Sequence, residues 1–400
     1  MAWRSQKSAL RKRLNSRWLR WVLWRGLFRV LPALGRRYSF PLHSVAAIDV
    51  AAEIIANGAG PLSGGFTDAQ MREVVLPAVA NDKMRQAHAP GTCRAVRQIA
   101  VVEDCALLGH VSTLIRRSDG AMLYHCAGSA PNWNFAKPGR LRSRRCEGLA
   151  TSLHDGQHYY HFFERVLGLI GYLDHEHRPG SALTLLTRAG GPAFQRETCA
   201  AIAAAYPGLS VREVGEDERA EIDRYLWLHD VADNTEWLPA TRERADRLAG
   251  ILRAHYRQGA PCVGELLFFS RGAARKRRLK NEAELEAIAA ARGFARFTAV
   301  TANHPEQVRR FANADVIVGV HGAGFTNLLF AQAGAAVIEL FPSNCVKSTY
   351  LWLSNRVNLR HYPLLGTQGD SQQAFDVAPD LFAARLDEVL AQRAQNRLTA

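Results

Sequence analysis

The chain has 400 residues, of which 48% are hydrophobic and 22% are charged, a composition typical of ordinary globular proteins. This length exceeds what one hydrophobic core usually fills, so we expect two domains. The formal net charge is +14, but residues 1–37 carry eleven Lys and Arg residues and no acidic residue. The rest of the chain is nearly neutral, with 40 basic and 37 acidic side chains. The charge therefore does not indicate a nucleic-acid-binding fold, and we expect no nucleic acid as a partner.

The basic N-terminal arm, residues 1–40, contains the run RWLRWVLWRGLFRVLPALGRR. Arg20, Arg25 and Arg29 interrupt its apolar residues, whereas a spanning helix needs about 20 mostly apolar residues. Trp and Phe beside Arg are typical of a helical segment that lies on an anionic membrane surface, and we predict this contact for residues 1–37. The arginines do not gather on one face of a helix, so a frayed basic tail is the alternative.

The seven cysteines are scattered along the chain, and none forms a C-x-x-C pair. Such a set suits a reducing compartment better than a disulfide framework or a structural zinc site. The arm also lacks the small-residue cleavage site of a secretory signal. We therefore expect a cytoplasmic protein that the arm holds peripherally at the inner membrane.

The first half of the chain changes its pattern near residue 148. Residues 41–145 contain short apolar runs among Gly, Pro and Arg, which predict strands with loops. Further on, the pattern predicts an alternation of strands at 148–155, 182–188 and 225–230 with helices at 157–172, 193–206 and 240–256. A break at 258–261, QGAP, is typical of a linker between domains.

The second half alternates more regularly. We expect strands at 265–270, 295–300, 315–320 and 336–341, with helices at 281–292, 304–313, 325–333 and 378–395. This order predicts an α/β fold with a parallel sheet and right-handed crossovers. We expect two Rossmann-like domains that face a cleft, after the helical arm. The predicted parts are the arm at 1–40, a first domain at 41–258, a second domain at 259–370 and a C-terminal helix at 371–400 that packs back.

The stretch DVIVGVHGAGFTNLLF at 315–330 places His321, Gly322, Ala323 and Gly324 where a strand turns into a helix. Ligands of open parallel sheets bind at such strand ends. Glycines let the backbone approach a ligand, and the amides of a helix N-terminus attract anions. We predict a phosphate or pyrophosphate site here, to which Thr326 and Asn327 add side-chain donors.

Glu339 ends the next predicted strand, in AVIELFP. A carboxylate at that place can accept two hydrogen bonds from a ribose diol, as the acidic residue of dinucleotide-binding folds does. Pyrophosphate at one strand end and ribose at the next predict a nucleoside diphosphate. The alternative is a structural glycine turn with an ion-paired glutamate.

Basic residues follow the strand at 265–270, in SRGAARKRRLKNEAEL. Guanidinium groups bind phosphates bidentately. From their spacing to Ser270 and Asn281, we predict that Arg271 and Arg277 contact the ligand, although a solvated charge run is the usual meaning of such a segment. Asn281 is a further candidate for the same site.

Three segments together resemble glycosyltransferase family 61, in its bacterial capsular-polysaccharide type. They are HYYHFFERVLGLI at 158–170, SRGAARKRRLKNEAEL at 270–285 and the His-Gly-Ala stretch with its later Glu-x-x-Pro. Gly324-Phe325 departs mildly from the usual family pattern. The resemblance implies a GT-B architecture and an inverting transferase, with a nucleotide-sugar as co-substrate in the C-terminal domain and no cofactor.

No Asp-x-Asp motif occurs in the chain, although metal-dependent transferases usually hold pyrophosphate through paired carboxylates and a divalent ion. We therefore predict no metal and expect helix dipole and arginines to bind the diphosphate. Several histidines crowd 154–177, but their spacing fits no H-E-x-x-H pattern.

Inversion requires a base that deprotonates the acceptor hydroxyl. Candidates are Asp155, His161 and Glu164, and the last two share a helix face because they are three residues apart. The resemblance favours His161 as base or acceptor contact, with Glu164 orienting it or serving as the base. A satisfied core histidine and a surface glutamate are the alternative.

We interpret the chain as an inverting glycosyltransferase that moves a sugar from a nucleotide-diphosphate donor to a glycan or lipid-linked acceptor, in surface polysaccharide biosynthesis. Two rivals share the architecture: a nucleotide-sugar epimerase or hydrolase, and a catalytically inactive, membrane-associated nucleotide-binding protein.

Overall fold

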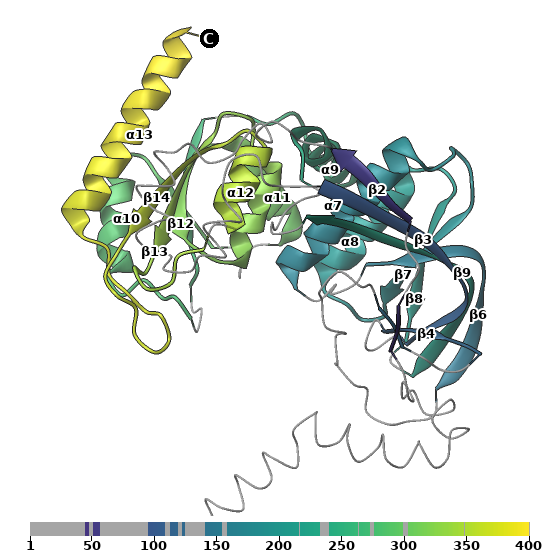
Figure 1. The fold of residues 1–400 in the computed structure, drawn as a ribbon. Coiled ribbons are helices and arrows are strands. Elements are labelled where there is room, and N and C mark those ends of the chain that lie inside the picture. The colour runs from purple at the N-terminus through teal and green to yellow at the C-terminus, as the bar shows by residue number, and fades with distance from the viewer. Residues whose placement is uncertain are drawn as a thin grey trace, which may run out of the picture. The chain divides into compact units, whose positions relative to one another are not determined.

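The computed structural model describes residues 45–47, 51–56, 95–108, 113–118, 122–124, 141–153, 158–215, 217–232, 240–262, 264–272, 276–298, 303–347 and 349–399. The predicted arm lies outside these residues. The chain divides into two units, each with its own sheet (Figure 1). The first unit comprises Met1–Glu53, Arg97–Gln157 and His177–His229, and the second comprises Ile54–Val96, His158–Glu176 and Asp230–Ala400.

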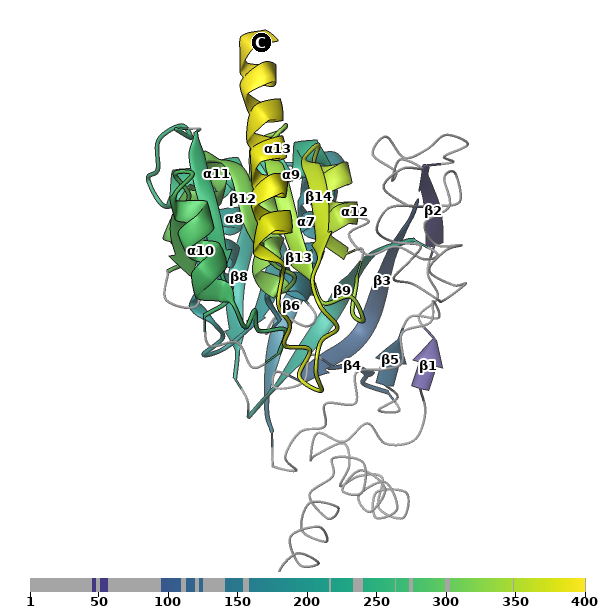
Figure 2. The same ribbon diagram turned by 90° about the vertical axis from the view of Figure 1, so that its left-hand side faces the viewer.

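The first unit is built on a mixed sheet. Its strand order is β1-β5-β4-β3-β9-β6-β7-β8, and β2 pairs with β3 (Figure 2). The strands are β1 (Val45–Ala47), β2 (Ala51–Ala56), β3 (Ala95–Leu108), β4 (Thr113–Arg116), β5 (Met122–Tyr124), β6 (Arg142–Ser152), β7 (Leu183–Arg188), β8 (Leu209–Val214) and β9 (Glu218–Ala232). Helix α8 (Ala193–Ala205) connects β7 to β8, which pair in parallel, as β6 does with both β7 and β9.

The second unit contains a fully parallel sheet in the order β11-β10-β12-β13-β14. The strands are β10 (Glu265–Ser270), β11 (Ala295–Thr298), β12 (Ala314–Val320), β13 (Ala336–Phe341) and β14 (Arg360–Leu365). Counted along the chain, this is the doubly wound order 2-1-3-4-5, whose direction reverses between the first and third strands. The switch point of the sheet therefore lies between β10 and β12.

Helices cover both faces of this parallel sheet (Figure 1). Alternate residues of β12, such as Val316 and Val318, pack against α10 (Glu282–Ala290) and α13 (Pro379–Thr399), which supply Leu285 and Phe382 to the same core. The other face meets α11 (His304–Asn313), the 3₁₀ helix η2 (Ala323–Phe330) and α12 (Thr349–Arg356). Because side chains alternate across a strand, β12 and β13 each contribute to both layers.

Helices α7 (Tyr159–His175) and α9 (Arg242–His255) pack on the outer side of η2, within the second unit. Phe163 of α7 meets Phe330 with ring centroids 5.8 Å apart. Arg242, in the first turn of α9, donates hydrogen bonds to two backbone carbonyl groups, of Ala331 at 2.9 Å and Val357 at 3.0 Å. The predicted boundary at residue 258 would have assigned both helices to the first domain.

The α/β class and the parallel sheets are confirmed. The segment expected as a helix at 325–333 is instead the 3₁₀ helix η2, which begins two residues earlier. Strands β8 and β14 and helix α12 were not predicted. The GT-B arrangement of the two units stays a prediction. Of the helices in the described part of the chain, none combines the length and apolarity that crossing a bilayer requires.

Two glycines allow a matched test of this packing. A methyl group on Gly319, in β12, would lie 2.6 Å from the backbone oxygen of Phe269 in the neighbouring strand, whereas one on Gly250, in α9, would have no contact within 4 Å. We expect Gly319→Ala to lower the free energy of unfolding by about 1–3 kcal/mol. Gly250→Ala should raise it by up to about 1 kcal/mol, because Ala favours helix. Urea unfolding measures both, and equal stability of the two variants would contradict the packing at β10 and β12.

Candidate functional site

Arg271 and His321 directly follow β10 and β12, at the switch point of the parallel sheet. Nη1 of Arg271 donates hydrogen bonds to the carbonyl oxygens of His321 and Lys276, at 3.0 Å each. The guanidinium group thus joins the two strand ends between which ligands of doubly wound sheets bind. Sequence reasoning had placed both residues at strand ends, and the structure brings them together.

Positive charge accumulates at this place. Burial, and next the nearby Arg277, lower the pKa of Arg271 to about 10, so it remains charged at neutral pH. Arg277 has a positive φ of 56°, uncommon for a residue with a side chain, and its N–H donates to the carbonyl of Gln372 at 2.9 Å. Within the described residues, neither guanidinium has an ion pair with a carboxylate. Such uncompensated guanidinium groups are a natural site for an anion.

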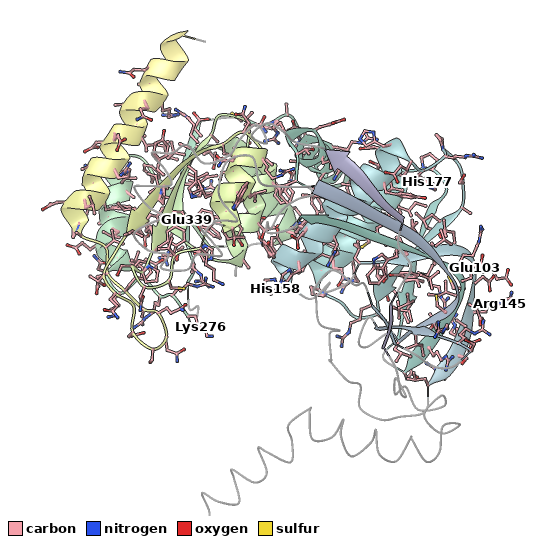
Figure 3. All side chains as sticks on the ribbon, viewed as in Figure 1. Glu103, Arg145, His158, His177, Lys276 and Glu339 are labelled. Atoms are coloured by element: carbon pink, nitrogen blue, oxygen red, sulfur yellow. The ribbon has the colours of Figure 1, made fainter. Side chains whose placement is uncertain are left out.

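Glu339 is buried inside the second unit, with an exposed fraction of 0% (Figure 3). Its Oε1 lies 2.6 Å from Nδ1 of His321, which is 4% exposed. Burial raises the pKa of Glu339 well above its usual value, and Arg277 opposes this shift. We predicted that this carboxylate contacts the ribose of a ligand, whereas in the structure it contacts other side chains inside the protein. The burial of Glu339 does not support the ribose contact, which stays a prediction.

Two residues that sequence reasoning missed complete this buried group. Nε2 of His361, on β14, lies 3.0 Å from Oε2 of Glu339, off the direction of an ideal hydrogen bond. Nδ1 of His361 forms a hydrogen bond of 2.8 Å with the hydroxyl of Ser354, on α12. Burial lowers the pKa of His361 to about 3, so this imidazole is neutral. Neither β14 nor α12 was expected, so the sequence offered no signal for them.

The glycine turn is more enclosed than predicted. His321, Gly322 and Thr326 are buried, whereas Ala323 and Gly324 are half-buried. A methyl group on Gly322 would lie 2.9 Å from the Arg271 guanidinium group, and one on Gly324 would lie 2.3 Å from the ring of Phe269. Glycine at these positions therefore lets Arg271 and Phe269 pack against the turn. The turn meets the surface through Ala323 and Gly324.

Asn327 is fully buried, and both ends of its amide are engaged within the protein. Its Oδ1 accepts a hydrogen bond of 2.6 Å from the Tyr159 hydroxyl, and its Nδ2 donates to Gln307 and to the carbonyl of Gly324, at 3.0 Å each. Burial raises the pKa of Tyr159 well above its usual value, which keeps the hydroxyl protonated as a donor. Asn327 thereby fixes the turn, and its predicted ligand contact stays a prediction.

Thr326 is enclosed by the protein, and Asn281 bonds to another segment of the chain. Thr326 is fully buried, and its hydroxyl has no hydrogen bond within the described part of the chain. Nδ2 of Asn281 donates to the carbonyl of Val377 at 2.9 Å, and its Oδ1 accepts from the Val377 N–H at 3.2 Å. This pairing attaches the start of α10 to the segment before α13. Donor binding by either side chain stays a prediction.

The proposed base residues lie on α7. His161 has a side chain that is 48% exposed, and its Nδ1 lies 3.5 Å from Oε2 of Glu164. The predicted His–Glu pair on one helix face is therefore present. Tyr160 lies on the inner face of the helix and approaches Tyr350. The ring centroid of Tyr350 lies 5.3 Å from that of His321. Asp155 lies outside the described residues.

A metal site is not apparent in the described segments, where no group of three His, Cys, Asp or Glu side chains has a suitable arrangement. The rings of His158, which precedes α7, and His161 lie tilted against each other with centroids 4.9 Å apart. The prediction of a metal-independent site is untested by this observation.

Comparisons with known proteins cover segments of both units rather than single residues. Residues 159–338 match the family model described as Glycosyltransferase 61. A protein of Canis lupus familiaris, named Protein O-linked-mannose beta-1,4-N-acetylglucosaminyltransferase 2, is 43% identical over 90 residues, which cover 21% of this chain and 15% of that protein. The chain thus matches only a small part of this relative. Both comparisons support a glycosyltransferase, and the matched range includes α7, Arg271, Arg277 and the His-Gly-Ala turn.

The aromatic packing behind Tyr159 predicts acid sensitivity. Nδ1 of the buried His304 lies 2.6 Å from the Tyr256 hydroxyl, and burial lowers the pKa of His304 to about 4. Between the usual histidine pKa of about 6.5 and this lower value, the unfolded chain binds a proton that the folded chain does not. The free energy of unfolding should therefore fall as the pH falls through this window, by about 1.4 kcal/mol per pH unit for each such histidine.

We expect His304→Gln to reduce the change in the free energy of unfolding with pH by the contribution of one histidine. Urea unfolding between about pH 7 and about pH 5 measures this change. His255→Gln is the control, since His255 is exposed on α9 and its variant should keep the wild-type slope. An unchanged slope in His304→Gln would show that His304 is not the buried neutral group.

Proposed function

We propose that the chain is a glycosyltransferase that transfers a sugar from a nucleoside-diphosphate donor to a hydroxyl group of an acceptor. The observation that carries the proposal is the pair of guanidinium groups, Arg271 and Arg277, which have no carboxylate partner among the described residues at the switch point beside His321. A doubly wound sheet binds its ligand at that edge, and two cations without counter-ions favour a diphosphate. The family match over residues 159–338 supports the same conclusion.

In this proposal the diphosphate serves as the leaving group. The anomeric carbon–oxygen bond breaks, and its electron pair passes to a phosphate oxygen, where Arg271, Arg277 and the nearby Lys347 stabilise the added charge. These cations replace a divalent ion, so the reaction needs no metal. A single displacement by the acceptor oxygen would invert the configuration at the anomeric carbon.

The acceptor hydroxyl must lose its proton during this displacement. We propose His161 as the base, because its imidazole is half-exposed and Glu164 lies close enough to orient it. The inner face of the same helix reaches the anion site through Tyr159 and Asn327. Donor site and base thus belong to the same unit, which supports their acting together.

The acceptor and the sugar are open to experiment. The Canis lupus familiaris relative is named for transfer of N-acetylglucosamine to O-linked mannose, so nucleotide-linked N-acetylglucosamine is the first donor to test. We propose a glycan or lipid-linked acceptor of a surface polysaccharide at the cytoplasmic membrane face, because the basic Trp-rich arm suits a membrane-proximal substrate.

Two neighbouring arginines test the diphosphate site. We expect Arg277→Ala to weaken binding of inorganic pyrophosphate and of UDP by about 10–100-fold, since a charge-assisted hydrogen bond contributes about 1.5–3 kcal/mol. Arg278→Ala removes the same charge from an exposed side chain in the same loop and should leave binding nearly unchanged. Calorimetry in EDTA measures both. Equal losses, or wild-type binding only with added metal, would contradict the site.

The base is tested separately. His161→Ala should keep pyrophosphate affinity but lower kcat by at least about 100-fold with nucleotide-linked N-acetylglucosamine and a panel of glycan acceptors, because general base catalysis typically contributes that much. Product analysis distinguishes the rivals: donor consumed without an acceptor indicates a hydrolase or epimerase, and tight binding without turnover indicates an inactive binding protein. Near-normal turnover of His161→Ala would refute its role as the base.

A further inference from the structure

A chain of four polar side chains runs through the buried layer beneath the anion site. Ser354 bonds to Nδ1 of His361 at 2.8 Å, Nε2 of His361 faces Oε2 of Glu339 at 3.0 Å, and Oε1 of Glu339 bonds to Nδ1 of His321 at 2.6 Å. All four residues are at most 4% exposed. Buried polar groups of this kind are rarely retained without a role, because each must be satisfied.

The hydrogen positions in this chain follow from counting donors and acceptors. Within the described residues, the buried hydroxyl of Ser354 has only Nδ1 of His361 as a partner, so it donates to that nitrogen. The neutral His361 then carries its proton on Nε2, which faces Oε2 of Glu339. Only Oε1 of Glu339 is left to hold a proton, and it lies against Nδ1 of His321.

The charges around His321 decide where the proton between Glu339 and His321 resides. Burial, and next Arg277, Lys347, Arg271 and His361, lower the pKa of His321 well below its usual value, whereas burial raises that of Glu339. The ring of Tyr350 also contacts the imidazole, with ring centroids 5.3 Å apart. The favoured state is therefore a protonated Glu339 that donates from Oε1 to Nδ1, with the proton of a neutral His321 on Nε2.

We propose that Glu339 and His361 are positioning residues that present the imidazole of His321 to the diphosphate as a neutral Nε2–H donor, and that Glu339 passes its proton to Nδ1 of His321 as negative charge develops on the leaving group. This role rests on the proposed glycosyl transfer. Within the described residues, no hydrogen bond or ion pair engages Nε2 of His321, so that nitrogen is available to a ligand. His321 would be the residue that contacts the substrate.

Every proton that moves in this step has a defined donor and acceptor. While the anomeric carbon–oxygen bond breaks, its electron pair moves to the bridging phosphate oxygen of the nucleoside diphosphate. The proton on Oε1 of Glu339 moves to Nδ1 of His321, which leaves a carboxylate and an imidazolium hydrogen-bonded through Nε2–H to the phosphate. The acceptor's proton goes to the base, and the Glu339 proton returns when the diphosphate leaves.

A neutral resting state of His321 also explains how this histidine can lie beside three positively charged side chains. An imidazolium ion would be repelled by Arg271, Arg277 and Lys347, and an ionised Glu339 would reduce the attraction of the site for an anion. The protonated Glu339 avoids both effects. The positive charge on His321 arises only when the diphosphate is there to stabilise it.

Nitrogen NMR of the histidine side chains tests this proposal in the full-length wild-type protein. Without ligand, His321 should be protonated on Nε2 and not on Nδ1, and saturation with inorganic pyrophosphate should move the Nδ1 resonance toward the protonated position. A free protein with Nδ1 protonated and Nε2 bare, or an Nδ1 resonance that stays fixed in the pyrophosphate complex, would overturn the proposal.

Glu339→Gln is the matched variant. Its amide N–H can donate to Nδ1 of His321 while its oxygen faces His361, so the His321 tautomer is kept but no proton can be passed. We expect pyrophosphate affinity within about threefold of wild type, and an Nδ1 resonance that no longer moves. The same movement in variant and wild type would refute the relay, and an affinity loss confined to UDP would instead support a ribose contact.

Failure of the proposed function appears differently, as a wild-type protein that binds neither pyrophosphate nor UDP. The ligand-free tautomer of His321 still tests the buried chain in that case. Should Glu339→Gln fail to fold, Ser354→Ala provides the second variant: it removes the donor that holds the His361 proton on Nε2, so the pyrophosphate-dependent movement of the His321 Nδ1 resonance should be smaller than in wild type, and an unchanged movement would contradict the relay.

Discussion

The proposed anion site depends on keeping the carboxyl group of Glu339 without charge. Glu339 lies fully buried on the inner face of β13, and ionising it would cost desolvation energy and would compensate the positive charge of Arg277. Two imidazoles against its oxygens make the neutral form tolerable. The guanidinium groups of Arg271 and Arg277 consequently keep their attraction for a ligand, because the nearest acid does not neutralise them. The electrostatics of the strand ends follow from this one protonation state.

The geometry of the same edge depends on α7, a helix far away in the sequence. Its Tyr159 hydroxyl donates to Asn327, and Asn327 in turn donates to the carbonyl of Gly324. The amide of Asn327 is fully buried, so losing either partner would leave an unsatisfied polar group at a cost of about 1–3 kcal/mol. The His-Gly-Ala turn and α7 are thus in direct contact, and both lie in the matched range 159–338.

The alternation of strands and helices was predictable, because runs such as ELLFFS and DVIVGV are buried on both faces and bounded by polar helices. For the same reason, the orientation of the Glu339 side chain could not be predicted. Every neighbour of Glu339 in AVIELF is apolar, so the pattern does not tell on which face of the sheet the side chain lies. Strand β14 was not predicted because RHYPLL contains Pro363 and polar residues. The contact of His361 with Glu339 was therefore not predicted either. The packing of α7 in the second unit depends on long-range contacts that no local pattern encodes.

The two faces of α7 divide the proposed chemistry. Helical periodicity turns Tyr160 and Phe163 inward, toward Tyr350 and Phe330, while His161 and Glu164 stay at the surface. The inner face contacts the turn that we propose binds the diphosphate, and the outer face carries the half-exposed imidazole that we propose as the base. In this proposal, α7 relates the position of the base to that of the turn. Precise orientation of this kind is what displacement at a sugar carbon requires.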